Sequence, residues 1–300
     1  MNGRPDLDGL ATEGANPRTK DLDLLPVEDM LRVMNAEDRR PAEAVGEVLP
    51  ALARAVSIAA DRLRAGGRMF LFGAGTSGRL GVLDASELPP TFGVSPSLVR
   101  GFIAGGDRAL RDAIEGAEDD PALGAADVAA ALTTALDVVV GIAASGRTPY
   151  VLGALAEARK RGAATIAVVC NRPTPAHAAA DVTIDPVVGE EVLAGSTRLK
   201  AGTAQKMVLN LLSTGVMVRL GMTYGNLMTG VSASNEKLRV RAAKLVAGIA
   251  KTSEARAAEV LASAGFDVRV ACVILRRSTD VESAKSLLAA AGGSLRAVIG

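Results

Sequence analysis

Aromatic side chains are scarce in this sequence of 300 residues, which contains 2 Tyr, 5 Phe and no Trp. Because proteins that hold single-stranded nucleic acids stack the bases on aromatic rings, this scarcity argues against such a platform. It also argues against an aromatic sugar-stacking cleft, although Phe92 and Tyr150 could each pack on a ligand. An excess of charge is missing too, since 34 basic and 33 acidic residues leave a formal net charge of +1. The composition therefore gives no electrostatic footprint for nucleic acid.

Cysteine and histidine are also rare. The two cysteines, Cys170 and Cys272, form no spaced metal-binding motif and no disulfide framework, which favours a reducing, cytoplasmic setting. The single histidine, His177, lies in a proline-rich connection and is interpreted as a solvated loop residue. A Ser-His-Asp triad, and most metal sites that contain histidine, would have to use it. Acid–base chemistry is therefore expected to fall mainly to Asp, Glu, Lys, Tyr or Cys.

Long apolar runs are absent as well. The N-terminal residues lack the apolar core of a secretory signal peptide. No apolar run reaches the roughly 18 residues that a membrane-spanning helix needs. We therefore predict a cytoplasmic protein with no membrane partner. At about 150 residues per domain the length suggests roughly two domains, enough to bury a core without disulfides or metals.

Short apolar runs alternate with helical patterns in the middle of the chain. Strands are expected at 68–72, 98–104, 138–143, 165–170 and 182–184. Helices are expected at 27–40, 41–65, 149–161, 196–220 and 236–250, with short helices after 252 and a loop at 221–235. This alternation predicts an α/β fold whose parallel sheet is covered on both faces. Ligands of such sheets bind at the carboxyl ends of the strands, near a topological switch point.

The segment Gly73–Arg79 (GAGTSGR) follows the first expected strand and opens a helix. Its small residues let backbone N–H groups converge at a helix N-terminus, which attracts an anion, and Thr76 and Ser77 add hydroxyl donors. The glycines also fit a dinucleotide-binding fingerprint, but the confirming acid should lie about 20 residues further on. Asp107 comes later than that. The pattern therefore favours a phosphate-binding loop over a dinucleotide site.

Two further segments carry related chemistry. Ala144–Pro149 (ASGRTP) again follows a strand and opens a helix, so the two loops together suit one phosphorylated ligand. In Gly195–Lys206, Ser196 or Thr197 could cap a helix. Its basic residues crowd the first helical turns, where positive charge opposes the helix dipole and predicts an anion or a carboxylate partner. These basic residues are Arg198, Lys200 and Lys206.

Three glutamates are candidates for acid–base catalysis. Glu87 is expected at a helix end that Pro89 and Pro90 terminate, where apolar neighbours could keep its carboxyl protonated. Helical spacing would put Glu115 and Glu118 on one face, and either could be a base. Exposure to water is the usual fate of glutamate, so the residues alone do not choose among the three.

Taken together, these motifs resemble those of the N-acetylmuramic acid 6-phosphate etherase family within the sugar isomerase (SIS) domain superfamily. The resemblance covers most of residues 10–250, and the last 50 residues carry no diagnostic motif. The matching segments are TEGAN (Thr12–Asn16), GAGTSGRLGVLDASELPPTFG (Gly73–Gly93), IAGG (Ile103–Gly106), EGAEDD (Glu115–Asp120), VVVGIAASGRTPYV (Val138–Val151), GSTRLKAGTAQK (Gly195–Lys206), GNLM (Gly225–Met228) and NEKL (Asn235–Leu238).

The resemblance implies cleavage of the D-lactyl ether of N-acetylmuramic acid 6-phosphate, with no metal or organic cofactor. Matched by motif position, Glu87 would protonate the departing lactyl oxygen or assist ring opening, and Glu118 would remove the C2 proton and later activate water. One of the three basic residues named above could meet the lactyl carboxylate. The implied substrate contacts are Gly75, Thr76, Ser77, Ser145, Gly146, Thr148, Ser196 and Lys200.

The resemblance also implies an SIS-type sheet flanked by helices in three layers, and a homodimer. We expect an N-terminal arm and helix at 1–50, the phosphosugar-binding domain at 51–225 and a helical region at 226–300. Three alternatives stay open: an aldose–ketose isomerase acting on a sugar phosphate, a non-catalytic sugar-phosphate sensor, and a dehydrogenase. Lactate release, binding without turnover, and bound nicotinamide cofactor would distinguish them.

Overall fold

The computed structural model describes residues 9–230 and 236–300, which form two compact units. The first unit comprises Met1–Ala85 and Val99–Leu212, and the second comprises Ser86–Leu98 and Ser213–Gly300. The division expected from the sequence, at residues 50 and 225, stays a prediction, and the compact units have bounds of their own. Within the described residues, no helix combines the length and hydropathy needed to cross a membrane.

A five-stranded parallel sheet forms the centre of the first unit, with the strand order β2-β1-β3-β4-β5. Every residue of β1, β3 and β4 is buried, as expected for strands covered on both faces. The parallel sheet and its five expected strands are confirmed. The strands are β1 (Met69–Gly73), β2 (Val99–Ile103), β3 (Val138–Ile142), β4 (Ala164–Val168) and β5 (Val182–Ile184).

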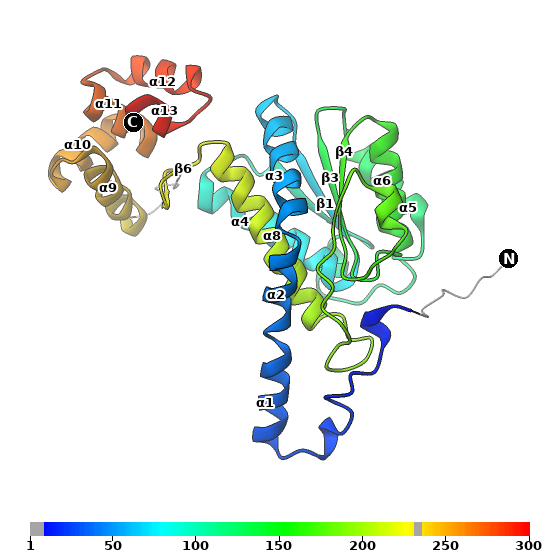
Figure 1. The fold of residues 1–300 in the computed structure, drawn as a ribbon. Coiled ribbons are helices and arrows are strands. Elements are labelled where there is room, and N and C mark those ends of the chain that lie inside the picture. The colour runs from blue at the N-terminus through cyan, green and yellow to red at the C-terminus, as the bar shows by residue number, and fades with distance from the viewer. Residues whose placement is uncertain (1–8, 231–235) are drawn as a thin grey trace. The chain divides into compact units, whose positions relative to one another are not determined.

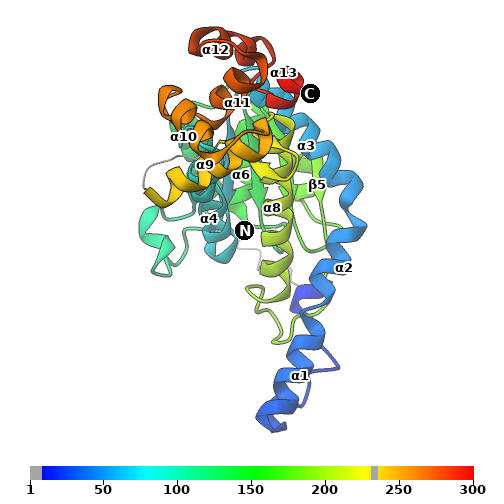
Figure 2. The ribbon, with the colours of Figure 1, turned by 90° about the vertical axis from the view of Figure 1, so that its left-hand side faces the viewer.

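Helices cover both faces of this sheet and complete the expected three layers (Figure 1). On one face lie α5 (Pro121–Ala130) and α6 (Pro149–Lys160), and α6 contacts β1, β3 and β4. The other face carries α3 (Leu49–Arg64), α4 (Gly75–Phe92) and α8 (Lys200–Arg219), which Figure 2 shows in front of the strands. The buried cluster between the sheet and α6 includes Phe70, Phe72, Tyr150 and Leu155.

Glycine allows α5 and α6 to approach each other closely. A Cβ atom on Gly124 would lie 1.9 Å from the Tyr150 carbonyl oxygen, and one on Gly153 would lie 2.0 Å from the Pro121 carbonyl oxygen. Any larger residue would therefore push the helices apart. Asp120 begins α5 by accepting a 2.7 Å hydrogen bond from the Ala122 N–H.

The N-terminal part of the first unit consists of helices that lead into α3. They are the short turns Ala11–Glu13 and Leu22–Leu24, then α1 (Val27–Glu37) and α2 (Arg40–Glu47). Pro41 lies in the first turn of α2, where its missing N–H costs nothing. Figures 1 and 2 both show α1 extending away from the sheet.

The second unit has a helical core of its own. Its helices are α9 (Glu236–Ala250), α10 (Glu254–Ser263), α11 (Val268–Arg277), α12 (Val281–Ala290) and α13 (Leu295–Ile299). Ser253, Asp267, Asp280 and Ser294 cap four of these helices through their side chains. The helices bury Leu261, Ala271, Cys272, Val273 and Leu295, among others. The short helices expected after residue 252 are confirmed.

Two local expectations differ from the structure. Pro89 and Pro90 were expected to end their helix, but α4 continues to Phe92, and Gly93 N–H donates to the Pro89 carbonyl at 2.9 Å. The two prolines remove only two helical donors close to the helix end, so the last turn persists. The expected loop at 221–235 contains a hairpin of β6 (Thr223–Tyr224) and β7 (Leu227–Met228), while 231–235 lie outside the described residues.

Candidate active site

The two glycine-containing loops leave the sheet at its topological switch point. From β1 the chain moves to β2 on one side and later to β3 on the other, so the connections diverge between β1 and β3. Gly73, the last residue of β1, pairs with Ile142, the last residue of β3. The loops that follow these strands therefore start side by side, at the edge where ligands of parallel sheets bind.

Close backbone contacts explain the glycines of the first loop. A Cβ on Gly73 would lie 2.6 Å from the Gly78 nitrogen, and one on Gly78 would lie 2.7 Å from the Gly73 carbonyl oxygen. Gly75 begins α4 with a positive φ of 52°, a conformation that favours glycine. The loop thereby turns directly into α4, and free N–H groups in the first turn of a helix are donors of the kind that bind anions.

The hydroxyls of the first loop lie against α8. Ser77 is 8% exposed, and its Oγ donates a 2.9 Å hydrogen bond to Gln205 Oε1. Thr76 is half-buried, and a Cβ on Gly202 would lie 3.4 Å from its methyl carbon. Helix α8 therefore packs against the first loop through Gln205 and Gly202.

The second loop is held by residues that follow β4 and by the N-terminal arm. Gly146 has a positive φ of 64°, and a Cβ there would lie 2.4 Å from Thr174 Oγ1. Asn171 Nδ2 donates to the Ala144 carbonyl at 2.9 Å and to Thr12 Oγ1 at 3.0 Å. Because Thr12 belongs to the TEGAN segment, this motif acts on the geometry of the second loop.

The binding hydroxyls expected in the second loop are both half-buried. Ser145 Oγ accepts a 3.2 Å hydrogen bond from the Arg147 N–H, a short turn within the loop. Thr148 precedes α6 directly, and its side chain makes no capping hydrogen bond in the described structure. The structure therefore brings Gly75, Ser145 and Thr148 to one edge of the sheet, as parts of adjacent loops.

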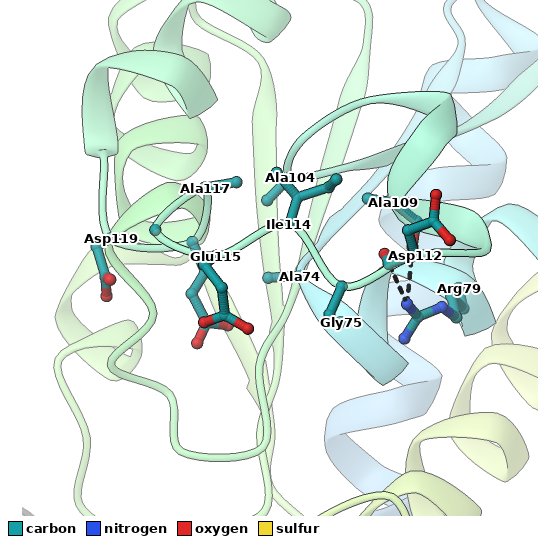
Figure 3. A pocket seen from close by; sticks show the side chains of 13 residues that line it. Ala74, Gly75, Arg79, Ala104, Ala109, Asp112, Ile114, Glu115, Ala117 and Asp119 are labelled. Atoms are coloured by element: carbon teal, nitrogen blue, oxygen red, sulfur yellow. Dashed lines mark hydrogen bonds between the residues drawn. The ribbon is translucent and has the colours of Figure 1, made fainter.

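A cavity of about 210 Å3 lies between the first loop and the segment that follows β2. Arg79 braces that segment, because its guanidinium donates to the carbonyls of Leu110 at 3.0 Å and Ala109 at 2.8 Å. Figure 3 shows Arg79 across the cavity from the carboxylates of Glu115 and Asp119. The lining residues are Ala74, Gly75, Arg79, Ala104, Ala109, Asp112, Ala113, Ile114, Glu115, Gly116, Ala117, Glu118 and Asp119.

Glu115 and Glu118 share this cavity without sharing a helix. The expected helical spacing is wrong, because residues 111–120 contain no helix and residues 115–118 form a turn. The glycine at 116 has a positive φ of 75°, which a helix does not permit. The tight turns nevertheless place both glutamates on the cavity lining.

The surroundings of Glu118 favour its neutral form. Although the residue is accessible to solvent, partial loss of hydration raises the pKa of its carboxyl above the ordinary value, and the charges of Asp119 and Glu115 add to this effect. Its backbone is anchored as well, since its carbonyl accepts a 3.0 Å hydrogen bond from Tyr150 N–H in the first turn of α6. Glu118 is therefore tied to the helix that the second loop opens.

Glu87 has different surroundings from those expected. Leu88 and Phe92 are buried, with 4% and 5% exposure, but the Glu87 side chain itself is exposed. The expected apolar environment of its carboxyl is therefore not formed by the described residues around it. Glu87 belongs to the second compact unit, whereas Glu118 belongs to the first.

An anion or a carboxylate partner was expected for the segment Gly195–Lys206, and carboxylates of the chain itself bind there. Glu191 accepts hydrogen bonds of 2.9 Å from the N–H groups of Lys200 and Ala201, and so caps α8. The expected caps, Ser196 and Thr197, are wrong, because α8 begins at Lys200. The N-terminus of α8 is therefore occupied by a carboxylate of the chain itself.

Lys200 is fully buried, and its ammonium donates a 2.6 Å hydrogen bond to Glu37. Glu37 also accepts hydrogen bonds from Arg18 and Asn16 of the N-terminal arm. The hydrogen bonds from Arg18, followed by those from Lys200 and Asn16, lower the pKa of Glu37 to about 2. This ion cluster connects α1 and the arm to the start of α8, which favours a structural role for Lys200.

The aromatic and histidine side chains considered for a site have internal partners. Tyr150 is fully buried, its hydroxyl donates a 2.6 Å hydrogen bond to Asp127, and desolvation raises its pKa. Phe92 is 5% exposed. His177 lies at the sheet edge in the short helix α7 (Ala176–Ala179), with Nε2 3.0 Å from Asp185 Oδ2. It is partly exposed and hydrogen-bonded rather than simply solvated.

Comparisons with known proteins agree with this geometry. The family "Glucokinase regulatory protein N-terminal SIS domain" matches residues 51–159, and the family "SIS domain" matches residues 121–215. A phosphoheptose isomerase structure from Francisella tularensis gives a TM-score of 0.45 at 19% identity, covering 63% of this chain and 97% of that chain. The parallel sheet covered by helices and the two SIS-domain family matches define an SIS-domain protein.

Relatives that match nearly the whole chain identify its family more specifically than the SIS domain does. The N-acetylmuramic acid 6-phosphate etherase of Pectobacterium atrosepticum is 53% identical over 297 residues, which cover 99% of this chain and 98% of that protein. The enzymes of the same name from Serratia proteamaculans and Vibrio campbellii are each 52% identical, over 98% and 97% of this chain and 99% and 94% of their own lengths. The chain belongs to the N-acetylmuramic acid 6-phosphate etherase family.

Proposed function

We propose that this chain cleaves the D-lactyl ether bond of N-acetylmuramic acid 6-phosphate to give N-acetylglucosamine 6-phosphate and D-lactate. It is a lyase by family, with relatives of that name over nearly its whole length. The observation that carries the assignment of the site is the cavity lined by both Gly75 and Glu118. It joins the phosphate-binding type of loop to a carboxylate with a raised pKa.

The phosphate of the substrate binds where the two loops start side by side. Backbone N–H groups at the N-termini of α4 and α6 attract the anion, and hydroxyls complete its coordination. The proposed contacts are Gly75, Thr76, Ser77, Ser145, Gly146 and Thr148. In support, the loops follow paired strand ends at the switch point.

The reaction is an elimination followed by an addition. In the ring-opened sugar, the C1 carbonyl makes the C2 proton acidic, and the Glu118 carboxylate removes it. The C3–O bond then breaks, C2 and C3 become doubly bonded, and the departing lactate takes a proton from Glu87. Water adds to C3 and a proton returns to C2, so that the product gains one water and loses one lactate. The raised pKa of Glu118 makes its carboxylate a stronger base near neutral pH.

Neither proton transfer requires a metal ion or an organic cofactor. The C1 carbonyl stabilises the carbanion at C2, and the carboxyl groups of Glu118 and Glu87 exchange the protons. Arg198 and Lys206 are exposed, whereas the Lys200 ammonium is bound to Glu37. We therefore propose that Lys200 acts by holding the start of α8 beside Ser196. An exposed basic residue of this segment is left for the lactyl carboxylate.

A homodimer in the cytoplasm completes the proposal. Helix α1 and the turn before it expose large apolar side chains: Leu24 is 77% exposed, Val27 69% and Leu31 54%. A second copy of the chain would cover them, and burying such side chains contributes about 1.5–3 kcal/mol each when complete. Light scattering is expected to give twice the chain mass for the parent protein and a smaller mass for Leu31→Glu.

The function is tested by incubating the purified chain with N-acetylmuramic acid 6-phosphate and measuring D-lactate enzymatically. We expect equal amounts of D-lactate and N-acetylglucosamine 6-phosphate, and far less product from unphosphorylated N-acetylmuramic acid. Conversion of an aldose phosphate to a ketose phosphate without lactate would favour an isomerase. Tight binding by calorimetry without turnover would favour a sensor, and either result would contradict the proposal.

A further inference from the structure

Gln205 of α8 has a buried side-chain amide in contact with the first loop. The residue is 1% exposed, and its Oε1 accepts the proton of Ser77 Oγ at 2.9 Å. Its other end, Nε2, is buried without a hydrogen-bond partner among the residues that the structure describes. A buried N–H group of this kind costs free energy and calls for an explanation.

The arrangement as described leaves Ser77 unable to donate to a phosphate. A serine hydroxyl has one proton and can also accept hydrogen bonds, whereas a phosphate oxygen of an ionised ester only accepts. While the Ser77 proton points at Gln205 Oε1, the hydroxyl has nothing to offer an anion. The proton becomes available only if Gln205 presents a donor instead.

Rotating the side-chain amide of Gln205, so that Nε2 and Oε1 exchange places, supplies that donor. Nε2 then donates to Ser77 Oγ, and the hydroxyl proton is released toward the anion. The number of unsatisfied buried atoms on Gln205 stays the same, because Oε1 takes the place of Nε2. The new hydrogen bond to phosphate is charge-assisted and stronger than the one it replaces. An anionic ligand therefore favours the turned amide.

We propose that Gln205 is a positioning residue that sets the direction of the Ser77 hydroxyl proton, and thereby favours an acceptor-only ligand such as a phosphate group. The proposal rests on the phosphate-binding role given to the first loop under the proposed function. It concerns binding of the phosphate and not the elimination itself.

The test uses Gln205→Glu, because an ionised carboxylate can only accept the Ser77 proton. The dissociation constants of inorganic phosphate and of N-acetylglucosamine 6-phosphate are measured by calorimetry across a pH series, as ratios to the parent chain. We expect affinity to fall about 10–100-fold where the new glutamate is ionised and to recover as it is protonated at lower pH. For N-acetylmuramic acid 6-phosphate, KM should rise while kcat stays within about threefold.

Two further variants distinguish the proposed orientation of the Ser77 hydroxyl by Gln205 from a structural effect. Asn210→Asp adds the same charge to an exposed position of the same helix and should leave phosphate affinity nearly unchanged. Gln205→Met removes both ends of the amide at similar size; its effect should be small, and absent in the Ser77→Ala background. Circular dichroism checks that each variant is folded, and Gln205→Met carries the test if Gln205→Glu is not.

The inference is overturned if Gln205→Glu binds phosphate like the parent, if its loss is independent of pH, or if Gln205→Met weakens binding equally with and without the Ser77 hydroxyl. Absence of phosphate binding that depends on Ser77 in the parent chain would also overturn it. Failure of the proposed function looks different, because phosphate binding would then keep its dependence on Gln205 while no D-lactate is released.

Discussion

Glu118 and Glu87 lie in different surroundings. Glu118 is in the segment 111–120, and Glu87 is near the end of α4. Glu118 lines a cavity, has a raised pKa and is anchored through its carbonyl to α6. Glu87, which is exposed like Glu118, belongs to the second compact unit. Catalysis is proposed for both residues, but the cavity of the first compact unit is lined by Glu118 and not by Glu87.

The two proposed catalytic roles therefore depend on the fold to unequal degrees. The proposed base, Glu118, needs a raised pKa and a fixed position, and the segment 111–120 together with α6 provides both. The proposed acid, Glu87, lies near a helix end and is exposed to water, which is the usual state of a glutamate. The predictions below separate the two regions.

The largest effect is expected for Glu118→Gln, because it removes the base while keeping the size of the side chain. We expect D-lactate release to fall about 10²–10⁴-fold. The melting temperature should not fall, since the variant removes a partly desolvated carboxylate that Asp119 and Glu115 repel. Glu115→Gln is the matched control on the same cavity, and it should lose less than about tenfold. A reversed order of these two losses would move the base to Glu115.

Glu87→Gln is expected to lower kcat about a hundredfold, as loss of a general acid does. Because the side chain is exposed, the free energy of unfolding should change by less than about 0.5 kcal/mol. Glu259→Gln, an exposed glutamate of the same compact unit, serves as the control and should leave kcat unchanged. Unchanged lactate release by Glu87→Gln would remove this residue from the mechanism.

Gly124→Ala tests whether the packing of α5 on α6 supports Glu118. The new methyl group would lie 1.9 Å from the Tyr150 carbonyl, so we expect a destabilisation of about 1–3 kcal/mol. Activity should fall as well, because the N–H of Tyr150 holds the Glu118 carbonyl. Gly46→Ala in α2, whose Cβ would meet no described atom within 4 Å, should instead stabilise by up to about 1 kcal/mol. Denaturant unfolding measures both, and equal effects would contradict the account.

The smallest effect concerns pH. A base works in its deprotonated form, so the raised pKa of Glu118 moves the acid limb of kcat/KM upward in pH. Asp119→Asn removes one of the charges that raise this pKa, and the limb should therefore move to lower pH. Asp112→Asn, on the same cavity lining, should leave it in place. A shift to higher pH in Asp119→Asn would show that the limb does not report Glu118.

The elements that could be predicted from the sequence depend on local patterns. The parallel strands follow from short apolar runs, and the two loops from glycines and hydroxyl residues at strand ends. The continuation of α4 through Pro89 and Pro90 could not be predicted, since it depends on how few helical bonds the prolines remove near the helix end.

Much of the support for the site depends on contacts between residues far apart in the sequence. Lys200 meets Glu37 across 163 positions, Asn171 meets Thr12 across 159, and Ser77 meets Gln205 across 128. The spacing of apolar residues along the sequence does not predict which distant residues pair in this way. The crowding of positive charge near the start of α8 was a local signal. It predicted an anion or a carboxylate partner, and the structure shows carboxylates, Glu191 and Glu37, which the signal did not identify.

The central claim is that Glu118 removes the C2 proton of the sugar. It is tested most directly by running the reaction in D2O and measuring deuterium at C2 of the N-acetylglucosamine 6-phosphate by mass spectrometry and NMR. We expect one deuterium at C2 with the parent chain, and incorporation slower by about a hundredfold or more in Glu118→Gln. Incorporation at the parental rate in Glu118→Gln would contradict the claim.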